Sequence, residues 1–329
     1  MTNQGIYVDT HSTDAYFNFG VEYFFAAEKK LEAPVFLLWR TKPTLMVGKY
    51  QNTYEEIDLP YAEAHNIDVV RRMSGGGTIY TDEGGWQYTF IQRDEEHEIR
   101  FQEFMEPVIR ALRSLGLPAE FNGRNDILVG GRKISGNAQY KLAGSTVHHG
   151  SLLFDTDIEE MVRSTTVDPY KIISKSIRSV RERVTNIRHH LSTDMDAETF
   201  REYMVRSILG DGGSVYELTD EDRAECERLA DCYFRPWERR YGANPKFSIV
   251  KSGHFPSGKV EVRLDVRRGV VTAAAVYGDF FANEQAENLG KSLVGCRFEK
   301  AALLEGLHSA GMDGAIYGIC AEDIVSVLF

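Results

Sequence analysis

The sequence predicts an α+β protein in which helices flank a mixed β-sheet and a small α+β domain follows at the C-terminus. Strand-like runs come in neighbouring groups with helical stretches between the groups, an order that argues against a regular alternation of strands and helices. Near the C-terminus, residues 259–267 alternate between apolar and charged side chains, as a half-buried strand does. A length of 329 residues fits one large domain or two of unequal size.

The N-terminal part carries helix and strand signals in turn. Asp14 can cap a helix in which Phe17, Val21 and Phe24 recur at helical spacing, and this helix ends before Pro34. The elements expected after it are two strands at 35–39 and 44–47 that form a hairpin or lie side by side, a helical stretch at 54–65, strands at 68–70 and 86–91, and an amphipathic helix at 103–115.

A two-glycine turn, Gly130-Gly131, joins candidate antiparallel strands at 127–129 and 132–135. The elements expected next are a strand at 147–154, a helix from Asp157, and helices at 197–209 and 220–231. The pattern breaks between residues 235 and 245, so we place the domains at 1–243 and 244–329. The elements expected in the second domain are strands at 259–267 and 270–277 and helices at 283–293, 299–308 and 321–328.

The composition indicates a soluble protein of a reducing compartment. A formal net charge of −11 argues against bulk attraction to nucleic acid or to an anionic membrane. The apolar runs fall short of the roughly 20 residues that a membrane span needs, and the first residues lack a secretory pattern. The four cysteines show neither metal-ligand spacing nor a disulfide framework. We therefore expect a cytoplasmic protein.

The stretch from Arg71 to Asp82 is the strongest candidate for a ligand-binding loop. It contains three consecutive glycines, Gly75 to Gly77, and Arg71 and Arg72 stand just upstream of them. Glycine triplets lose much backbone entropy on ordering, so they are favoured where side chains would block the approach of a ligand to the backbone. Arginine offers a planar fork of donors for phosphate or carboxylate. This stretch predicts an anion cradle, with a flexible turn as the alternative.

Four other features are candidates for chemistry. Lys133 follows the two-glycine turn and either points inward, where it can bridge a carboxylate and a phosphate, or is a solvated edge lysine. Asp126 can hold Mg²⁺ or act as a turn acceptor. His148 and His149 must point to opposite faces of a strand, so at most one of them faces a pocket. From 171 to 190, six Lys or Arg stand against one acid, which suits a solvated face or a small anionic ligand.

Five phrases, in this order and spacing, resemble the lipoate–protein ligase family. They are Arg71-Arg-Met-Ser-Gly-Gly-Gly-Thr-Ile-Tyr80, Gly123-Arg-Asn-Asp-Ile127, Gly131-Arg-Lys-Ile-Ser-Gly-Asn-Ala-Gln139, His148-His-Gly-Ser-Leu-Leu-Phe154 and Lys175-Ser-Ile-Arg-Ser-Val-Arg-Glu-Arg-Val184. The flanks of Tyr277-Gly-Asp-Phe-Phe281 resemble the accessory C-terminal domain of the bacterial ligases. The resemblance therefore covers essentially the whole chain.

The resemblance implies a catalytic domain of the biotinyl/lipoyl-ligase type and a two-step reaction. ATP and lipoate would give lipoyl-AMP and pyrophosphate, and a lysine of a lipoyl carrier domain would then take the lipoyl group. The carriers implied are the E2 subunits of 2-oxoacid dehydrogenases or the glycine cleavage H protein. Mg²⁺ would accompany the nucleotide.

The resemblance also implies residue roles. Lys133 would contact both the lipoyl carbonyl and the phosphate, and would be the catalytic residue. ATP or lipoyl-AMP would be held by Lys133 together with Arg72, Gly75, Gly76, Gly77, Thr78, Ile79, Tyr80, Asn125 and Asp126. Lipoate would contact Lys133, Arg72 and His149. An adenylate-binding loop would carry Lys175, Arg178, Arg181 and Arg183.

Two positions depart from the family pattern. Thr81-Asp82 stands where many relatives have His-Asp, and Ser176 stands where glycine is usual.

Three alternative functions remain to be weighed. An ATP-independent octanoyl or lipoyl transferase needs a cysteine thiolate, yet the chain has no cysteine before Cys226. A biotin ligase and a non-catalytic sensor of lipoyl carriers are the other two. The sequence alone does not choose the carrier, the preference between lipoate, octanoate and a bound lipoyl group, or the oligomeric state.

Overall fold

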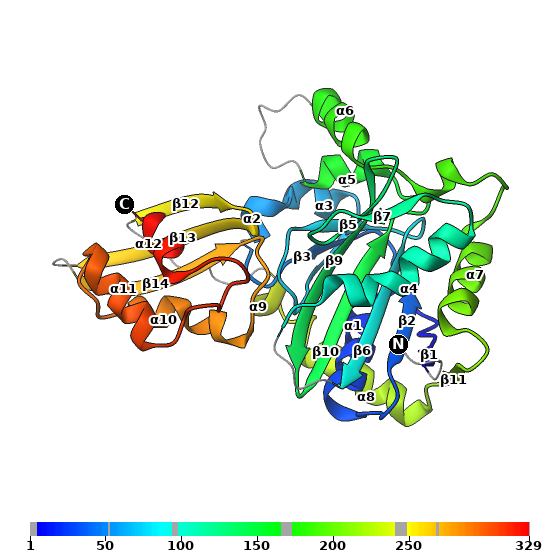
Figure 1. Ribbon diagram of the computed structural model, residues 1–329, viewed down its shortest axis with the longest axis horizontal. Coiled ribbons are helices and arrows are strands. Elements are labelled where there is room, and N and C mark those ends of the chain that lie inside the picture. The colour runs from blue at the N-terminus through cyan, green and yellow to red at the C-terminus, as the bar shows by residue number, and fades with distance from the viewer. Residues whose placement is uncertain are drawn as a thin grey trace.

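The computed structural model describes residues 5–51, 53–93, 98–165, 173–240, 249–267 and 270–328. Within these residues an eight-stranded sheet has the order β11-β1-β2-β6-β10-β9-β8-β7 (Figure 1). Its strands are β1 (Ile6–Val8), β2 (Val35–Trp39), β6 (Trp86–Arg93), β7 (Ala119–Phe121), β8 (Asp126–Val129), β9 (Arg132–Leu142), β10 (Ser145–Leu152) and β11 (Ser214–Tyr216). Strand β1 pairs in parallel with β2 and β11, and the other pairs are antiparallel, so the predicted mixed sheet is confirmed.

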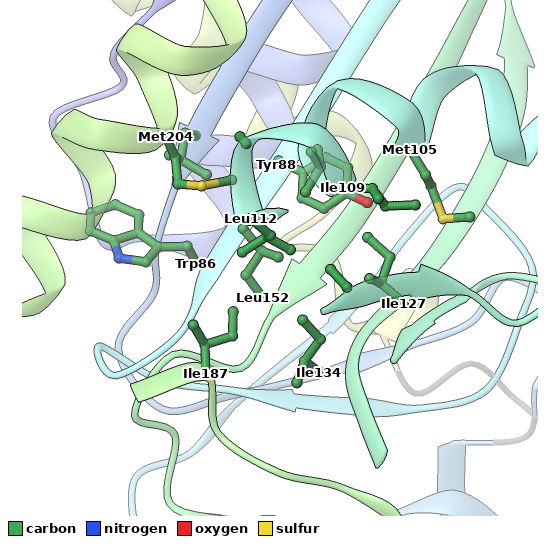
Figure 2. Packing of buried hydrophobic residues seen from close by; sticks show 14 of the residues in the cluster. Trp86, Tyr88, Met105, Ile109, Leu112, Ile127, Ile134, Leu152, Ile187 and Met204 are labelled. Atoms are coloured by element: carbon green, nitrogen blue, oxygen red, sulfur yellow. The ribbon is translucent and has the colours of Figure 1, made fainter. Parts of the chain in front are cut away.

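Helices cover both faces of this sheet, because strand β2 is apolar on both sides. Phe36 and Leu38 pack in a core with α4 (Phe101–Ser114) and α7 (Ala197–Leu209), which Figure 2 shows from close by. Val35, Leu37 and Trp39 pack on the other face against α1 (Ala15–Tyr23) and α8 (Asp220–Tyr233). Asp14 caps α1 as predicted, its carboxylate accepting from the amide of Tyr16, and the chain continues into a π-helical turn, η1 (Phe24–Glu28).

A second sheet of three strands, β4-β3-β5, carries the glycine stretch. Strand β3 (Thr44–Val47) pairs in parallel with β4 (Asp68–Arg71) and antiparallel with β5 (Ile79–Thr81). The expected pairing of 35–39 with 44–47 is therefore wrong, since these strands belong to different sheets. Pro43 gives the reason: its carbonyl accepts from the amide of Asp68, which turns the chain towards β4. Helices α2 (Thr53–Glu56), α3 (Leu59–Ala64) and α5 (Ile158–Thr165) belong to this part, and α3 and α5 pack on it.

The C-terminal unit, from β12 to α12, has its own sheet and core. Strands β12 (Ile249–Phe255), β13 (Gly258–Arg267) and β14 (Val270–Gly278) form an antiparallel sheet, of which the sequence predicted β13 and β14 but not β12. The helices packed in this unit are η3 (Glu284–Asn288), α10 (Leu289–Leu293), α11 (Lys300–Ser309) and α12 (Ala321–Ser326). The expected domain boundary between residues 243 and 244 lies outside the described residues.

The C-terminal unit contacts the loop that follows β3 directly. The rings of Tyr50 and Phe280 stack with centroids 4.8 Å apart, and the amide of Gly278 donates to the carbonyl of Tyr50 at 2.7 Å. Lys49 also pairs with Glu287 of η3. These contacts place the segment from Gly278 to Glu287 against the loop that follows β3. In the described part of the chain, no helix is both long and apolar enough to cross a bilayer.

Candidate active site

A cavity of ≈ 140 Å³ lies between the glycine stretch, the strands β9 and β10, and the C-terminal unit. One part of its wall is apolar, and the residues there are Phe19, Trp39, Met46, Ile79, Ala138 and Phe281. The rest is polar and includes Arg72, Thr78, Gln87, Asn125, Lys133, Asn137, His149 and Ser151, with Gly76, Gly77, Gly136 and Gly150. Such a combination of an apolar compartment with a few converging polar groups is typical of a small-molecule site.

Most residues predicted from the sequence meet at this cavity. Those that line it are Arg72, Gly76, Gly77, Thr78, Ile79, Asn125, Lys133 and His149. Of the residues predicted in the glycine stretch and around Lys133, three do not line it. Gly75 packs against the backbone of Phe280, and Asp126 stands behind Lys133. Tyr80 lies on β5 with its side chain 3% exposed among the apolar residues of the small sheet, so the structure does not place its side chain at the cavity.

Lys133 reaches the cavity because of the turn before it and the glycine after it. Gly130 and Gly131 have φ angles of 57° and 73°, which suit the tight turn between β8 and β9. The ammonium of Lys133 lies 2.7 Å from Oδ1 of Asp126. A side chain on Gly136 would bring its Cβ within 2.8 Å of Nζ of Lys133, so glycine leaves the space that the lysine fills.

Arg72 is buried and holds the glycine stretch in shape. Its guanidinium donates to the carbonyls of Met46, Gly75 and Gly77 at 2.5, 3.0 and 2.6 Å. Burial lowers the pKa of Arg72 to about 10, and the charge of Arg71 adds to this effect. Gly76 has a φ of 90° and donates its amide to the carbonyl of Phe280 at 2.9 Å. The loop is thus fixed from one side by Arg72 and from the other by the C-terminal unit.

The two adjacent histidines face opposite sides of β10, as predicted. The ring of His149 lines the cavity, with Nε2 2.6 Å from Oγ of Ser74 and Nδ1 3.1 Å from Oε2 of Glu22. His148 points to the other face, where it stacks on Phe104 at 5.2 Å between centroids. Burial holds the pKa of His148 well below its usual range. His149 is therefore the histidine that can contact a ligand.

The basic segment, in which the sequence predicted an adenylate-binding loop at 175–183, forms a helix in this structure, α6 (Ile173–Arg183). Arg178, Arg181 and Arg183 are exposed and are not among the residues that line the cavity, and the side chain of Lys175 lies outside the described part. Arginine at exposed helix positions has high helix propensity, which favours this conformation. The segment after α6 still reaches the site, because the amide of Thr185 donates to the carbonyl of Lys133 at 3.0 Å.

Thr81 and Asp82 take part in structure at the position where relatives have His-Asp. The hydroxyl of Thr81 is buried and lies 2.6 Å from that of Thr41. Asp82 accepts from the amide of Asp157 at 2.8 Å, and burial raises its pKa. Thr81 therefore joins β5 to the turn after β2.

Sequence reasoning missed much of the apolar wall. Phe19 sits on α1, Trp39 on β2, Met46 on β3 and Phe281 after β14, so these four residues come from four separate segments. Periodicity marks such residues as core and gives no signal that they border a cavity. Phe281 was the exception, since it belongs to a phrase that resembles the accessory domain.

In the described part of the chain, a magnesium ion beside Lys133 would find the carboxylate of Asp126. Its Oδ1 faces Lys133, and its Oδ2 accepts from the side-chain amide of Asn122 at 3.1 Å. Among the described residues, the group of three side chains close enough to hold a metal by themselves is His308, Asp313 and Glu322, all exposed on the C-terminal unit. Because Mg²⁺ that travels with nucleotide phosphates needs only one or two carboxylates, Asp126 fits that use.

The fold and this site together define an acyl-activating ligase, and comparison with known proteins names the family. The lipoyl protein ligase A/B catalytic domain matches residues 14–209, and the bacterial lipoate protein ligase C-terminus matches residues 244–328. The chain is 41% identical to lipoate–protein ligase 1 of Staphylococcus aureus over 86% of its length and 87% of that protein. It is 36% identical to lipoate-protein ligase LplJ of Bacillus subtilis over 98% of its length and 100% of that protein. The chain belongs to the lipoate–protein ligase family.

Solved structures agree on the fold. LipL1 of P. falciparum in complex with lipoate has a TM-score of 0.77 at 21% identity, with 92% of this chain and 94% of that chain covered. Lipoate-protein ligase A bound with ATP has a TM-score of 0.61 at 23% identity, with 74% of this chain and 99% of that chain covered. The predicted fold is confirmed as that of the lipoate–protein ligases.

Proposed function

We propose that this chain is an ATP-dependent lipoate–protein ligase. It joins the carboxylate of lipoate to the α-phosphate of ATP and then transfers the lipoyl group to a lysine of a lipoyl carrier domain. The observation that carries the proposal is the meeting of the Lys133 ammonium, the apolar wall and the glycine stretch at one cavity. The apolar wall suits the carbon chain and dithiolane ring, and the polar part suits the reacting anions.

In the first step a carboxylate oxygen attacks the α-phosphorus and pyrophosphate leaves. Both partners are anions, so fixed cations and amide donors at the site lower the barrier by stabilising the charge of the transition state. Lys133 supplies a compact charge that can face the acyl carbonyl and the phosphate together. Arg72 donates three hydrogen bonds to the loop, at Ser74, Gly75 and Gly77, and a fourth to the carbonyl of Met46 on β3. We therefore propose that it acts chiefly by holding the loop in position for the phosphates, and through its charge.

In the second step the amine of the carrier lysine attacks the acyl carbonyl, the bond to AMP breaks, and an amide forms. Lys133 stabilises the oxygen that becomes negative during the attack. We assign Asn125 to the nucleotide and His149 to the acyl part of the ligand. The C-terminal end of α6 lies beside Lys133 through the bond from Thr185, and we propose that the side chains of Lys175, Arg178, Arg181 and Arg183 reach the adenylate after α6 rearranges.

We also propose that Mg²⁺ binds with ATP and that Asp126 contributes one ligand. When bound, the ion would neutralise phosphate charge. The glycine-stretch residues Gly75 and Tyr80 contribute to nucleotide binding through the backbone, since Gly75 is pressed against Phe280 and the Tyr80 ring is buried. The carriers would be E2 subunits of 2-oxoacid dehydrogenases or the glycine cleavage H protein, and the setting would be the cytoplasm.

For domain organisation we propose a catalytic domain at 1–243 and an accessory domain at 244–329. The separate sheet and core of the C-terminal unit support this division. The acyl transferase is not favoured, because it needs a reactive thiolate at the pocket. Cys226 is the first cysteine, it packs beside Gly20 in the core between α1 and α8, and burial raises its pKa to about 12.

The test combines two assays on the purified chain. Exchange of labelled pyrophosphate into ATP, dependent on lipoate, reports the first step. Mass spectrometry of candidate carriers after incubation with ATP, Mg²⁺ and lipoate reports the second. We expect both, with a mass increase on one lysine of the carrier. Acyl transfer between carriers without nucleotide, and no exchange, would replace this proposal by the transferase.

A further inference from the structure

Glu22 is a buried carboxylate next to the acyl part of the cavity. It sits on α1 with 1% of its surface exposed. Its oxygens accept from the hydroxyl of Tyr140 at 2.9 Å, from that of Thr89 at 2.8 Å, and from Nδ1 of His149 at 3.1 Å. A buried carboxylate is costly unless it is paired and hydrogen-bonded, so these three donors fix the position of Glu22 and, through it, the ring of His149.

The contacts continue from His149 to the glycine stretch. Nε2 of His149 lies 2.6 Å from Oγ of Ser74, and Nε of Arg72 donates to the same oxygen at 3.1 Å. Arg72 then donates to the carbonyls of Gly75 and Gly77. Glu22, His149, Ser74 and Arg72 form what we call the buried polar network.

The hydrogens of this network have a consistent arrangement. A carboxylate only accepts, so Nδ1 of His149 carries the hydrogen that Glu22 receives. A guanidinium only donates, so Oγ of Ser74 accepts from Arg72. The hydroxyl of Ser74 can then give its own hydrogen to Nε2 of His149. The four groups are joined by consecutive hydrogen bonds, so we expect a change at Glu22 to disturb Arg72 at the other end of the network.

The two ends of the network face different ligands. His149 lines the cavity beside Phe19, whose ring lies 6.1 Å from its own between centroids, and so borders the apolar compartment. Arg72 borders the glycine stretch. Ser74, which joins them, is fully buried and does not line the cavity. Ser74 is placed to link His149 at the apolar compartment with Arg72 at the glycine stretch.

The amide of Gly76 in the glycine stretch is already engaged by the C-terminal unit and is not free for a ligand. In this structure Gly76, at a φ of 90°, gives its amide to the carbonyl of Phe280. A phosphate at the loop needs amide donors, and glycine can change its backbone angles at little steric cost. A ligand that favours one arrangement of the loop shifts the equilibrium in proportion to its differential affinity.

We propose that the buried polar network couples the two substrates. A lipoyl chain against His149 orders the ring, Ser74 and Arg72, and thereby raises the affinity of the glycine stretch for ATP phosphates. By thermodynamic linkage ATP then raises the affinity for lipoate by the same factor. Glu22 and Ser74 are positioning residues in this scheme, since they act through His149 and Arg72. The inference rests on the proposed function and adds to it a coupling between the binding of lipoate and the binding of ATP.

The experiment measures binding by calorimetry with two probes, lipoate and α,β-methylene ATP, which cannot form the adenylate. For the unaltered chain we expect lipoate to lower the Kd of the nucleotide about fivefold or more, and the nucleotide to lower the Kd of lipoate equally. In Ser74→Ala and in Glu22→Gln we expect the ratio to fall to about one, with each ligand still binding. Circular dichroism and thermal melts show which variants are folded.

Tyr140→Phe is the matched control. It removes one of the three hydrogen bonds to Glu22 and leaves the contacts among Glu22, His149, Ser74 and Arg72 in place, so its coupling ratio should stay near that of the unaltered chain. Equal loss of coupling in Tyr140→Phe would overturn the inference, as would full coupling in a folded Ser74→Ala or Glu22→Gln variant. Binding of both probes without coupling in the unaltered chain overturns the inference alone. A chain that binds neither probe and forms no adenylate overturns the proposed function as well.

Discussion

The ammonium of Lys133 lies 2.7 Å from Oδ1 of Asp126, beside the two-glycine turn that joins β8 to β9. The two side chains are 38% and 22% exposed, and ion pairs with this much solvent contribute little to stability. The pair matters for position instead. Asp126 holds the lysine at the border of the cavity, in the space that Gly136 leaves open.

Removing the charge of Lys133 should cost activity without costing stability. In Lys133→Ala we expect the kcat of lipoate-dependent pyrophosphate exchange to fall about 10²- to 10³-fold, the usual effect of losing one group that stabilises transition-state charge. Lys259→Ala is the control, because Lys259 is also 38% exposed and pairs with Glu261 at 3.2 Å on the C-terminal unit. Equal urea midpoints for all three proteins, with equal exchange rates, would remove the role of Lys133.

Asp126→Asn separates a metal role from a positioning role. If Asp126 contributes a ligand to Mg²⁺, the concentration of Mg²⁺ that gives half-maximal exchange should rise about tenfold. That is our expected result, measured by titrating Mg²⁺ at saturating ATP and lipoate. A lower kcat with an unchanged Mg²⁺ requirement would leave Asp126 as a residue that only orients Lys133.

A methyl group at Gly75 should destabilise the protein by displacing the C-terminal unit, whereas a methyl group at Gly77 should have far less effect. A Cβ on Gly75 would collide with the carbonyl of Phe280, which belongs to the backbone and cannot turn away. On Gly77 the nearest atom would be Cβ of Asp279 at 3.8 Å, an ordinary contact. We expect Gly75→Ala to lower the free energy of unfolding by about 1–3 kcal/mol and Gly77→Ala to change it far less. Urea unfolding followed by fluorescence measures both, and equal losses would contradict the prediction.

The sequence was a good guide to the elements and a partial one to the site. Strong periodicity and caps located α1, α4, α7 and α8, and the two-glycine turn located β8 and β9. The strands β1, β5, β7 and β11 are three residues long, too short to show a period, and β12 lacks a clear alternation. Glycine and lysine phrases marked the polar part of the cavity. The apolar wall and Glu22 were missed because contacts between distant segments define them.

Movement of the C-terminal unit should be needed for one of the two steps. The amide of Gly76 is occupied by Phe280, and Phe281 closes part of the cavity wall, so ligand binding and carrier access compete with this arrangement. Cysteines in place of Lys49 and Glu287, which form an ion pair, allow a bismaleimide cross-link between the two parts. The exposed Cys232 and Cys320 must first become serine.

The cross-linked protein should show unequal changes in the two steps, with transfer from preformed lipoyl-AMP to a carrier slowed more than pyrophosphate exchange. Cleaving a linker that contains a disulfide should restore the rate, which separates restraint from damage. If both steps kept their original rates in the cross-linked form, the C-terminal unit would not need to move.

His148 should make the protein lose stability in mild acid. Burial holds its pKa well below the usual value of about 6.5, so in the folded state it stays neutral while the unfolded chain takes up a proton below pH 6.5. The unfolded state then binds more protons, and the free energy of unfolding falls as pH decreases, by up to about 1.4 kcal/mol for each pH unit. Between pH 6.5 and 5 this amounts to about 2 kcal/mol. His148→Gln keeps a donor for Asn137 and should flatten this part of the stability curve. The exposed His308→Gln should leave the slope as it is, and an unchanged slope in His148→Gln would show that other groups carry the acid sensitivity.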